Sequence, residues 1–211
     1  MMSTQENLPP QQRILLATIQ CIERHGLSGT TVRRITELAG VNVAAINYYF
    51  GSKDRLLEAA LAATLEEGFP KALTELKELL AEAGAGGVRE AVEAFLRDYL
   101  THALDYPRIS VAHLGNALLR QDYASQAPVA IRAFADGFLD VLSPHLPQPT
   151  AVDRRRAVVH VWATIIQLAL LPDLFGVPRD ELRGEGMARM LTATLLGPEP
   201  STPPAKAFPW P

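Results

Sequence analysis

The stretch TVRRITELAGVNVAAINYYFGSK, residues 31–53, decides how the rest of the chain is interpreted. Its apolar residues Val32, Ile35 and Leu38 recur at the spacing of one face of a helix. A short amphipathic helix is therefore predicted over residues 31–39, with a threonine hydroxyl available to cap its first turn.

A turn and a second helix follow directly. Gly40 can adopt the left-handed conformation that ends a helix, because it has no Cβ. Asn42 offers a side-chain oxygen to cap a second helix over residues 43–49. Two short helices joined by a three-residue turn form a helix-turn-helix, whose second helix can enter the major groove of DNA.

The second helix divides its faces between a core and a groove. Ile46 and Phe50 are four residues apart and are predicted to pack on the first helix. On the opposite face, asparagine can pair with adenine, alanine can touch the thymine methyl, and tyrosine or lysine can bind phosphate. The candidate DNA-binding residues are Thr31, Arg33, Asn42, Ala44, Ala45, Asn47, Tyr48, Tyr49 and Lys53. By spacing alone, a plain α-hairpin with packing tyrosines explains the pattern equally well.

A family resemblance favours the DNA-binding alternative. AGVNVAAINYYFGSKDRLLEAAL resembles the DNA-binding signature of TetR-family transcriptional regulators, with Gly40, Tyr48, Phe50 and Lys53 in the expected places. ILLATIQCIERHGLSGTTVRRITELAG is similar to the first two helices of that family. The close resemblance covers residues 11–65, and the rest of the chain resembles the family only in length and all-helical layout. The segment VAA at 43–45 lacks the lysine or polar residues that many members carry there, so the operator sequence cannot be read from it.

Composition and charge fit a small DNA-facing module on a larger body. The chain has 211 residues, 48% of them hydrophobic, and a formal net charge of −3. Residues 1–55 contain six basic and four acidic side chains, a net charge of +2, which leaves −5 for the remainder. This asymmetry is typical of a DNA-binding module attached to an acidic regulatory domain.

The sequence also predicts the compartment. A polar N-terminus without a basic and apolar run indicates no signal peptide, and no stretch is long and apolar enough to span a membrane. The single cysteine, Cys21, cannot form an internal disulfide and is expected in the core. We therefore expect a cytoplasmic protein without a membrane partner.

Helical patterns continue to the end of the body. A long helix is predicted from residue 53 to about residue 83, with a kink at Gly68-Phe69-Pro70, and AGAGG at 83–87 is the clearest linker. Further helices are predicted over residues 88–104, 109–119, 128–146, 153–171 and 179–196. The predicted fold is all-α, with a three-helix DNA-binding domain (1–52), a roughly six-helix regulatory and dimerisation domain (53–197), and a proline-rich tail (198–211).

The helix over residues 153–171 is apolar nearly all round, which predicts burial on two sides. One side would meet the chain's own core and the other a second subunit, with Ile165 favoured at the interface and Trp162 in the core. The family resemblance also implies pairing through the last two long helices. The candidate dimer-interface residues are Val158, Val161, Ile165, Leu168, Met190, Leu191 and Leu195. The alternative is a central helix in a monomer.

The body also carries groups that can hold an effector between its helices. The candidate ligand-binding residues are Phe95, Tyr99, His102, His113, Asn116, Arg120, Phe134 and Phe138, with Arg97 as a further polar anchor. Apolar walls with cationic groups favour a hydrophobic or amphipathic molecule such as an acid or acyl thioester. His102, His113 and His160 do not show metal-ligand spacing, so neither a metal nor a cofactor is predicted.

The sequence therefore predicts a homodimeric transcriptional repressor that binds a palindromic double-stranded DNA operator and is released by a small-molecule effector. The chain shows no nucleophile with an evident base and no phosphate-binding loop, so it is not expected to be an enzyme. Two alternatives remain: a helical-bundle enzyme with a structural N-terminal hairpin, and a regulator that responds to a protein partner.

Overall fold

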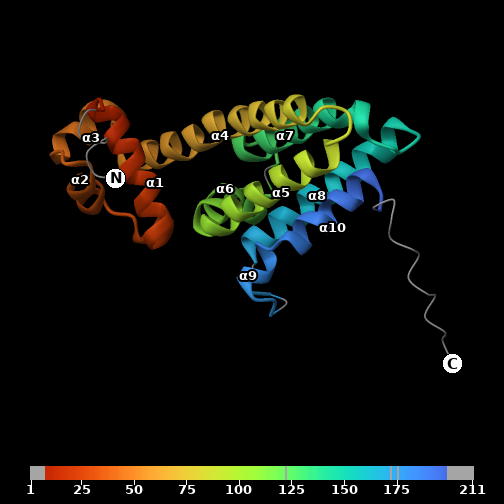
Figure 1. Cartoon of the computed structure of the whole chain (residues 1–211). Helices are drawn as coiled ribbons and strands as arrows, with labels where there is room; N and C mark the ends of the chain where they lie inside the picture. Colours follow the sequence, from red (N-terminus) through yellow and green to blue (C-terminus); the bar gives the residue numbers. More distant parts are fainter. Residues whose placement is uncertain (1–7, 122, 172, 175, 199–211) are drawn as a thin grey trace.

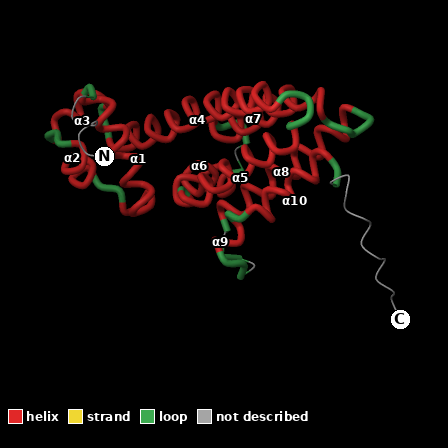
Figure 2. The backbone as a smooth tube through the Cα atoms, in the orientation of Figure 1, coloured by secondary structure: helices red, strands yellow, loops and turns green. Residues whose placement is uncertain are grey.

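The computed structural model describes residues 8–121, 123–171, 173–174 and 176–198; for residues 116–120 it describes the backbone but not the side chains. Within these ranges all regular structure is helical and no β-strand occurs, which confirms the predicted all-α fold. Figure 2 shows the helices joined by short loops. In Figure 1 a compact N-terminal cluster and a larger helical body lie at opposite ends of the long helix α4. No helix in the described part of the chain is long and apolar enough to cross a membrane.

The N-terminal cluster consists of α1 (Pro10–Gly29), α2 (Val32–Ala39) and α3 (Val43–Phe50). Gly26 breaks α1 near its end, with φ 70° and ψ 173°, and one more helical turn follows this sharp kink. The cluster has its own core, made of Ile14, Ala17, Cys21, Ile35, Ala39, Ile46 and Leu56. Because this core includes a residue of α4, the long helix fixes the orientation of the cluster.

Helix α4 (Lys53–Ala83) runs through Pro70 without a break. The helix is continuous across the predicted kink at residues 68–70 and ends at Ala83, as predicted. Proline removes one backbone hydrogen bond, but Phe69 and Leu76 pack on the core of the body on either side of it and hold the helix in place. The continuous helix connects the N-terminal cluster to the body as one rod.

The body is built from α4, α5 (Val88–Asp105), α6 (Pro107–Arg120), α7 (Gln126–Leu142), a short 3-10 turn (Ser143–His145), α8 (Ala151–Leu170), α9 (Arg179–Leu182) and α10 (Glu185–Leu196). The last predicted helix is divided in two at Gly184, whose extended backbone stands at the N-cap of α10. The main core joins α4, α5, α7, α8 and α10 through large buried side chains such as Leu96, Phe138 and Trp162.

A second connection fastens the N-terminal cluster to the body. Ile22 of α1 packs with Ile109 and Ala112 of α6 in a small buried cluster. The Glu23 carboxylate accepts a hydrogen bond from the Ile109 amide at 3.0 Å, and the Arg108 guanidinium donates to the backbone carbonyl of Glu23 at 3.3 Å. The start of α6 is therefore fastened to the end of α1. If the N-terminal cluster moves, α6 must move with it, or these hydrogen bonds are stretched.

Candidate functional site

The turn between α2 and α3 has the geometry that the sequence predicts. Gly40 adopts the left-handed conformation at φ 63° and ψ 41°, and the Val41 amide donates to the Thr36 carbonyl at 3.1 Å. The Asn42 side-chain oxygen accepts from the Ala45 amide at 3.0 Å and caps α3. A side chain at Gly40 would force a strained backbone, so the angle between α2 and α3 depends on this glycine.

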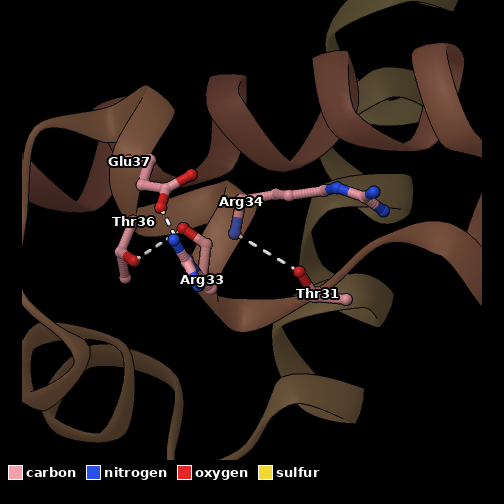
Figure 3. Close-up of polar contacts among 5 residues, drawn as sticks. All are labelled: Thr31, Arg33, Arg34, Thr36 and Glu37. Atoms are coloured by element: carbon pink, nitrogen blue, oxygen red, sulfur yellow. Dashed lines mark hydrogen bonds and ion pairs between the residues drawn. The ribbon is translucent and has the colours of Figure 1, made fainter.

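Helix α2 presents polar side chains at its start. Thr31 caps it by accepting from the Arg34 amide at 3.3 Å, and the Thr36 hydroxyl donates to the Arg33 carbonyl at 2.9 Å (Figure 3). Figure 3 also shows the ion pair between Arg33 and Glu37, 2.8 Å long and fully on the surface. The Glu37 carboxylate raises the pKa of Arg33 by this hydrogen bond. The pair uses only Nε of Arg33, so the terminal nitrogens of its guanidinium can still contact a phosphate.

Helix α3 buries one side and exposes the other. Ile46 is fully buried, and Phe50 packs on the same core. On the outer side Tyr48 is 82% exposed and Asn47 is also exposed, which is the predicted division of faces. The rings of Tyr48 and Tyr49 meet edge to face at 4.9 Å, so the two side chains hold one another in position.

The other candidate DNA-binding residues lie around this surface, with one exception. Thr31, Asn42 and Ala44 are exposed, and Lys53 stands at the first turn of α4. Ala45 is partly buried against the core of the cluster, so its methyl group is turned away from the outer face of α3. The spacing predicted it at the margin of that face, and packing on α1 and α2 takes it out of the contact surface.

A cavity of about 930 Å³ lies between the cluster and the body. Of the candidate ligand-binding residues, Phe95, Tyr99, His102, His113 and Phe134 line it. Phe138 stands behind the wall, with its ring 5.0 Å from that of Trp162 and 5.8 Å from that of Phe95. The side chains of Asn116 and Arg120 lie outside the described residues.

One wall of the cavity is aromatic. Phe134 stacks on Phe69 with ring centroids 4.5 Å apart and on Tyr99 at 5.6 Å. Trp162 meets Tyr99 and Phe134 edge to face, both at 4.8 Å. These four rings come from α4, α5, α7 and α8, so a molecule in the cavity contacts most of the helices of the body.

His113 and Tyr99 are the polar groups within this apolar space. The Thr64 hydroxyl donates to the Leu61 carbonyl at 2.7 Å and can therefore accept from His113 Nε2, which lies 2.8 Å away. Burial lowers the pKa of His113 to about 4, so the imidazole is uncharged at neutral pH. Burial also raises the pKa of the Tyr99 hydroxyl. Both groups therefore act as neutral hydrogen-bonding partners.

Sequence reasoning missed part of the cavity wall. Leu15, Leu16 and Ile19 of α1 line the cavity, together with Phe69 of α4 and Trp162 of α8. The sequence does not single out these α1 residues as cavity lining, because their helical spacing is the same whether they meet the core of the cluster or a cavity. The expected anchor Arg97 lies outside this cavity, beside a smaller surface hollow between α5 and α10.

Most of the predicted dimer-interface residues lie in the chain's own core rather than on its surface. The side chains of Val158, Val161, Ile165, Leu191 and Leu195 are buried within the single chain and cannot meet another subunit. Leu168 is half-buried on the same core, and of the seven residues only Met190, at 54% exposed, is open to solvent. Ile165 and Trp162 both lie in the core, so the expected contrast between them is wrong. The exposed apolar side chains of α8 are instead Val152 and Val159.

The described residues contain no group of three or more histidine, cysteine, aspartate or glutamate side chains that could hold a metal ion. The N-terminal geometry has a clear counterpart among known proteins. Residues 14–60, from α1 to the second turn of α4, match the model of the bacterial regulatory proteins of the tetR family. Residues 14–60 therefore resemble the DNA-binding segment of TetR-family regulators. Over 89 residues the chain is 34% identical to the HTH-type transcriptional regulator BetI 1 of Chromohalobacter salexigens.

That alignment covers 41% of this chain and 40% of the BetI protein, so the chain spans about two fifths of the length of the curated relatives it matches. Solved structures extend the likeness in fold to the body. A TetR-family regulator from Mesorhizobium loti superposes with a TM-score of 0.61 at 14% identity, over 87% of this chain and 95% of that one. A TetR-family regulator from Streptomyces coelicolor gives 0.64 at 18% identity, over 88% and 79%. The proteins matched are transcriptional regulators rather than enzymes.

Proposed function

We propose that this chain is a TetR-like DNA-binding transcriptional repressor that binds a palindromic operator as a homodimer and is released by a small-molecule effector. The observation that carries the proposal is the outer face of α3. It presents Asn47 and Tyr48 to solvent on a helix fixed by the Gly40 turn and the Asn42 cap. An exposed asparagine on such a helix can make a bidentate pair with adenine, while the tyrosine hydroxyls suit phosphates.

Dimerisation is proposed through the outer sides of α8 and α10, which pack on one another at the edge of the body (Figure 1). Val152 and Val159 lie seven residues apart on one side of α8 and are 58% and 52% exposed. Met190 of α10 is exposed to a similar degree. Isolated exposed valines are ordinary, but two at helical spacing on α8, with an exposed methionine on the neighbouring helix α10, fit an isologous contact between two copies. Two copies of α3 would then read two half-sites of one operator.

Effector control is proposed to act through the cavity. A molecule bound there contacts Leu15 and Ile19 of α1 on one side and the aromatic wall of the body on the other. The cavity also borders His113 of α6, and α6 is tied to α1 through Glu23. A ligand that separates these helices therefore changes the position of α3. To raise the population of the conformation that does not bind DNA from 1% to 99%, the ligand must bind this conformation more tightly than the DNA-binding one by about 5.5 kcal/mol.

Selection from a random DNA library with the purified full-length protein tests the proposal. We expect enrichment of an inverted repeat, with half-site centres about one helical turn or a multiple of it apart. The α-hairpin and enzyme alternatives predict no enriched sequence. A single half-site without its repeat would contradict the dimer but retain the DNA-binding function.

A further inference from the structure

The outer side of α3 carries a continuous strip of uncharged side chains. Val43 and Ala44 lie in the first turn of the helix, and Asn47 and Tyr48 lie four residues further on; all four are exposed. Residues four apart on a helix lie one above the other, so Val43 is in line with Asn47 and Ala44 with Tyr48. These four residues form the outer strip, which the proposed function presents to the major groove.

Folding does not account for the valine in this strip. Val43 is 52% exposed, whereas its neighbours Val41 and Ala45 pack on the core of the N-terminal cluster. Among the described residues, the side chains that form or cover this core do not include Val43. Valine is also a weaker helix former than alanine, so it does not stabilise the first turn of α3 by propensity. The isopropyl group of Val43 is therefore available to contact a partner.

The chemistry of the outer strip fits A·T pairs. In the major groove, guanine is read by arginine or lysine, and the amino group of cytosine by aspartate or glutamate. Residues 43–50, VAAINYYF, contain none of these four residue types. Asparagine can form two hydrogen bonds with adenine, and an apolar side chain can contact the methyl group of thymine. Both bases of an A·T pair thus have a suitable partner on α3.

The position of Val43 brings it close to the bases. The N-terminal residues of a reading helix contact the base edges, and the short side chains of Val43 and Ala44 let the first turn of α3 approach them closely. Four residues of helix span about 6 Å, and successive base pairs are about 3.4 Å apart. A base contacted by Val43 is therefore within about two base pairs of the base bound by Asn47.

We infer that Val43 packs on the methyl group of a thymine in each half-site, within two base pairs of an adenine bound by Asn47. This inference rests on the proposed DNA-binding function and names the bases that it reads. Val43 supplies an apolar contact and Asn47 supplies hydrogen bonds, so the two residues together select A·T pairs at the centre of the half-site.

Replacing single thymines of the selected operator by deoxyuridine tests the inference, because uracil pairs as thymine does and lacks only the methyl group. At the contacted thymine of one half-site, the affinity of the wild-type protein should fall about fourfold, which corresponds to the burial of one methyl group. Unchanged affinity for every uracil-substituted operator would overturn the inference. The choice of A·T pairs would then depend on the shape of the duplex rather than on the methyl group.

The variant Val43→Ala assigns the methyl contact to its side chain. Alanine favours the helix, so α3 is retained while the contact is lost. The variant should bind the thymine operator and the uracil operator equally. Val129→Ala is the matched control, because Val129 is a 46% exposed valine on α7 in the body, and it should lose about fourfold on the uracil operator as the wild type does. A Val43→Ala protein that keeps the full loss would overturn the assignment.

Selection from the random DNA library with the wild-type protein and with Val43→Ala separates this inference from the proposed function. A relaxed preference of the variant at an A·T pair supports both. An enriched operator on which Val43→Ala changes no base preference, or relaxes it at a G·C pair, leaves the DNA-binding function standing and overturns the inference alone. A library without any enriched site contradicts both.

Discussion

Replacing His113 by glutamine should remove a pH-dependent loss of stability. Burial lowers the pKa of His113 from 6.5 to about 4, so the folded chain resists protonation there. Between these two values the unfolded chain binds a proton that the folded chain does not. The free energy of unfolding therefore falls as the pH falls from 6.5 towards 4, and this group causes no further loss below pH 4. The full difference corresponds to about 3 kcal/mol.

His113→Gln is the appropriate variant because its amide can still donate to the Thr64 hydroxyl, which His113 meets at 2.8 Å. The two proteins should have similar stability at pH 7, within about 1 kcal/mol, the usual size of one hydrogen bond. As the pH is lowered to 4.5, the variant should become the more stable protein by about 2 to 3 kcal/mol.

Urea unfolding at half-unit steps between pH 7 and pH 4.5 measures this difference. Other titrating groups are common to both proteins, so their contributions cancel when the two curves are subtracted. Parallel curves across this range would mean that His113 is protonated as easily in the folded chain as in the unfolded one. That result would refute the buried position of His113 between α4 and α6.

Three further substitutions test other parts of the account. Lys53→Ala should weaken DNA binding evenly across sequences and reduce the slope of log affinity against log salt concentration by about one, as measured by fluorescence anisotropy. The control Lys77→Ala, far along α4, should bind DNA like the wild type in the same titrations. Val159→Arg should give a folded monomer in sedimentation velocity, and a dimeric Val159→Arg protein would contradict the proposed interface. Ile165→Arg should instead prevent folding, because it buries an unpaired charge and lowers the free energy of unfolding by about 3 to 5 kcal/mol. Asn42→Ala should lower the free energy of unfolding by about 1 kcal/mol, because α3 loses its cap; unchanged thermal unfolding would contradict the cap.

The helix-turn-helix could be predicted from sequence because its determinants are local. The end of α2 depends on the conformational freedom of Gly40, and the start of α3 depends on the side chain of Asn42. Both act within four residues along the chain, so the pattern of residue types is sufficient. The inward side of α3 was also predicted, since Ile46 and Phe50 are its large apolar residues at helical spacing.

The dimer face could not be predicted in the same way. Helix α8 is apolar on several sides, and periodicity does not say which side meets the chain's own core. Ile165 is drawn inward by α10 and α5, whereas Val159 on the other side is left exposed. The apolar pattern of the sequence does not distinguish Ile165 from Val159, so only tertiary packing decides which of the two is buried.

The cavity was predicted only in part for a related reason. Tyr99 and Phe134 lie on predicted body helices and were expected to face a shared space. Leu16 belongs to the N-terminal cluster, and only the contact between α1 and α6 brings it to the same cavity. Arg97 was expected as a polar anchor but lies beside the smaller hollow between α5 and α10, because the sequence does not show which way a side chain on α5 points.

The most direct test of the account is the specificity ratio of the protein for its selected operator over a scrambled duplex of the same length and salt. Asn47 is exposed on the outer face of α3, and the account makes it a base-reading residue. The wild-type ratio should exceed about 10³. Asn47→Ala should lower it by about tenfold or more, with little change in affinity for the scrambled duplex. A wild-type ratio near one, or an Asn47→Ala protein with an unchanged ratio, would contradict the claim that this face of α3 reads DNA.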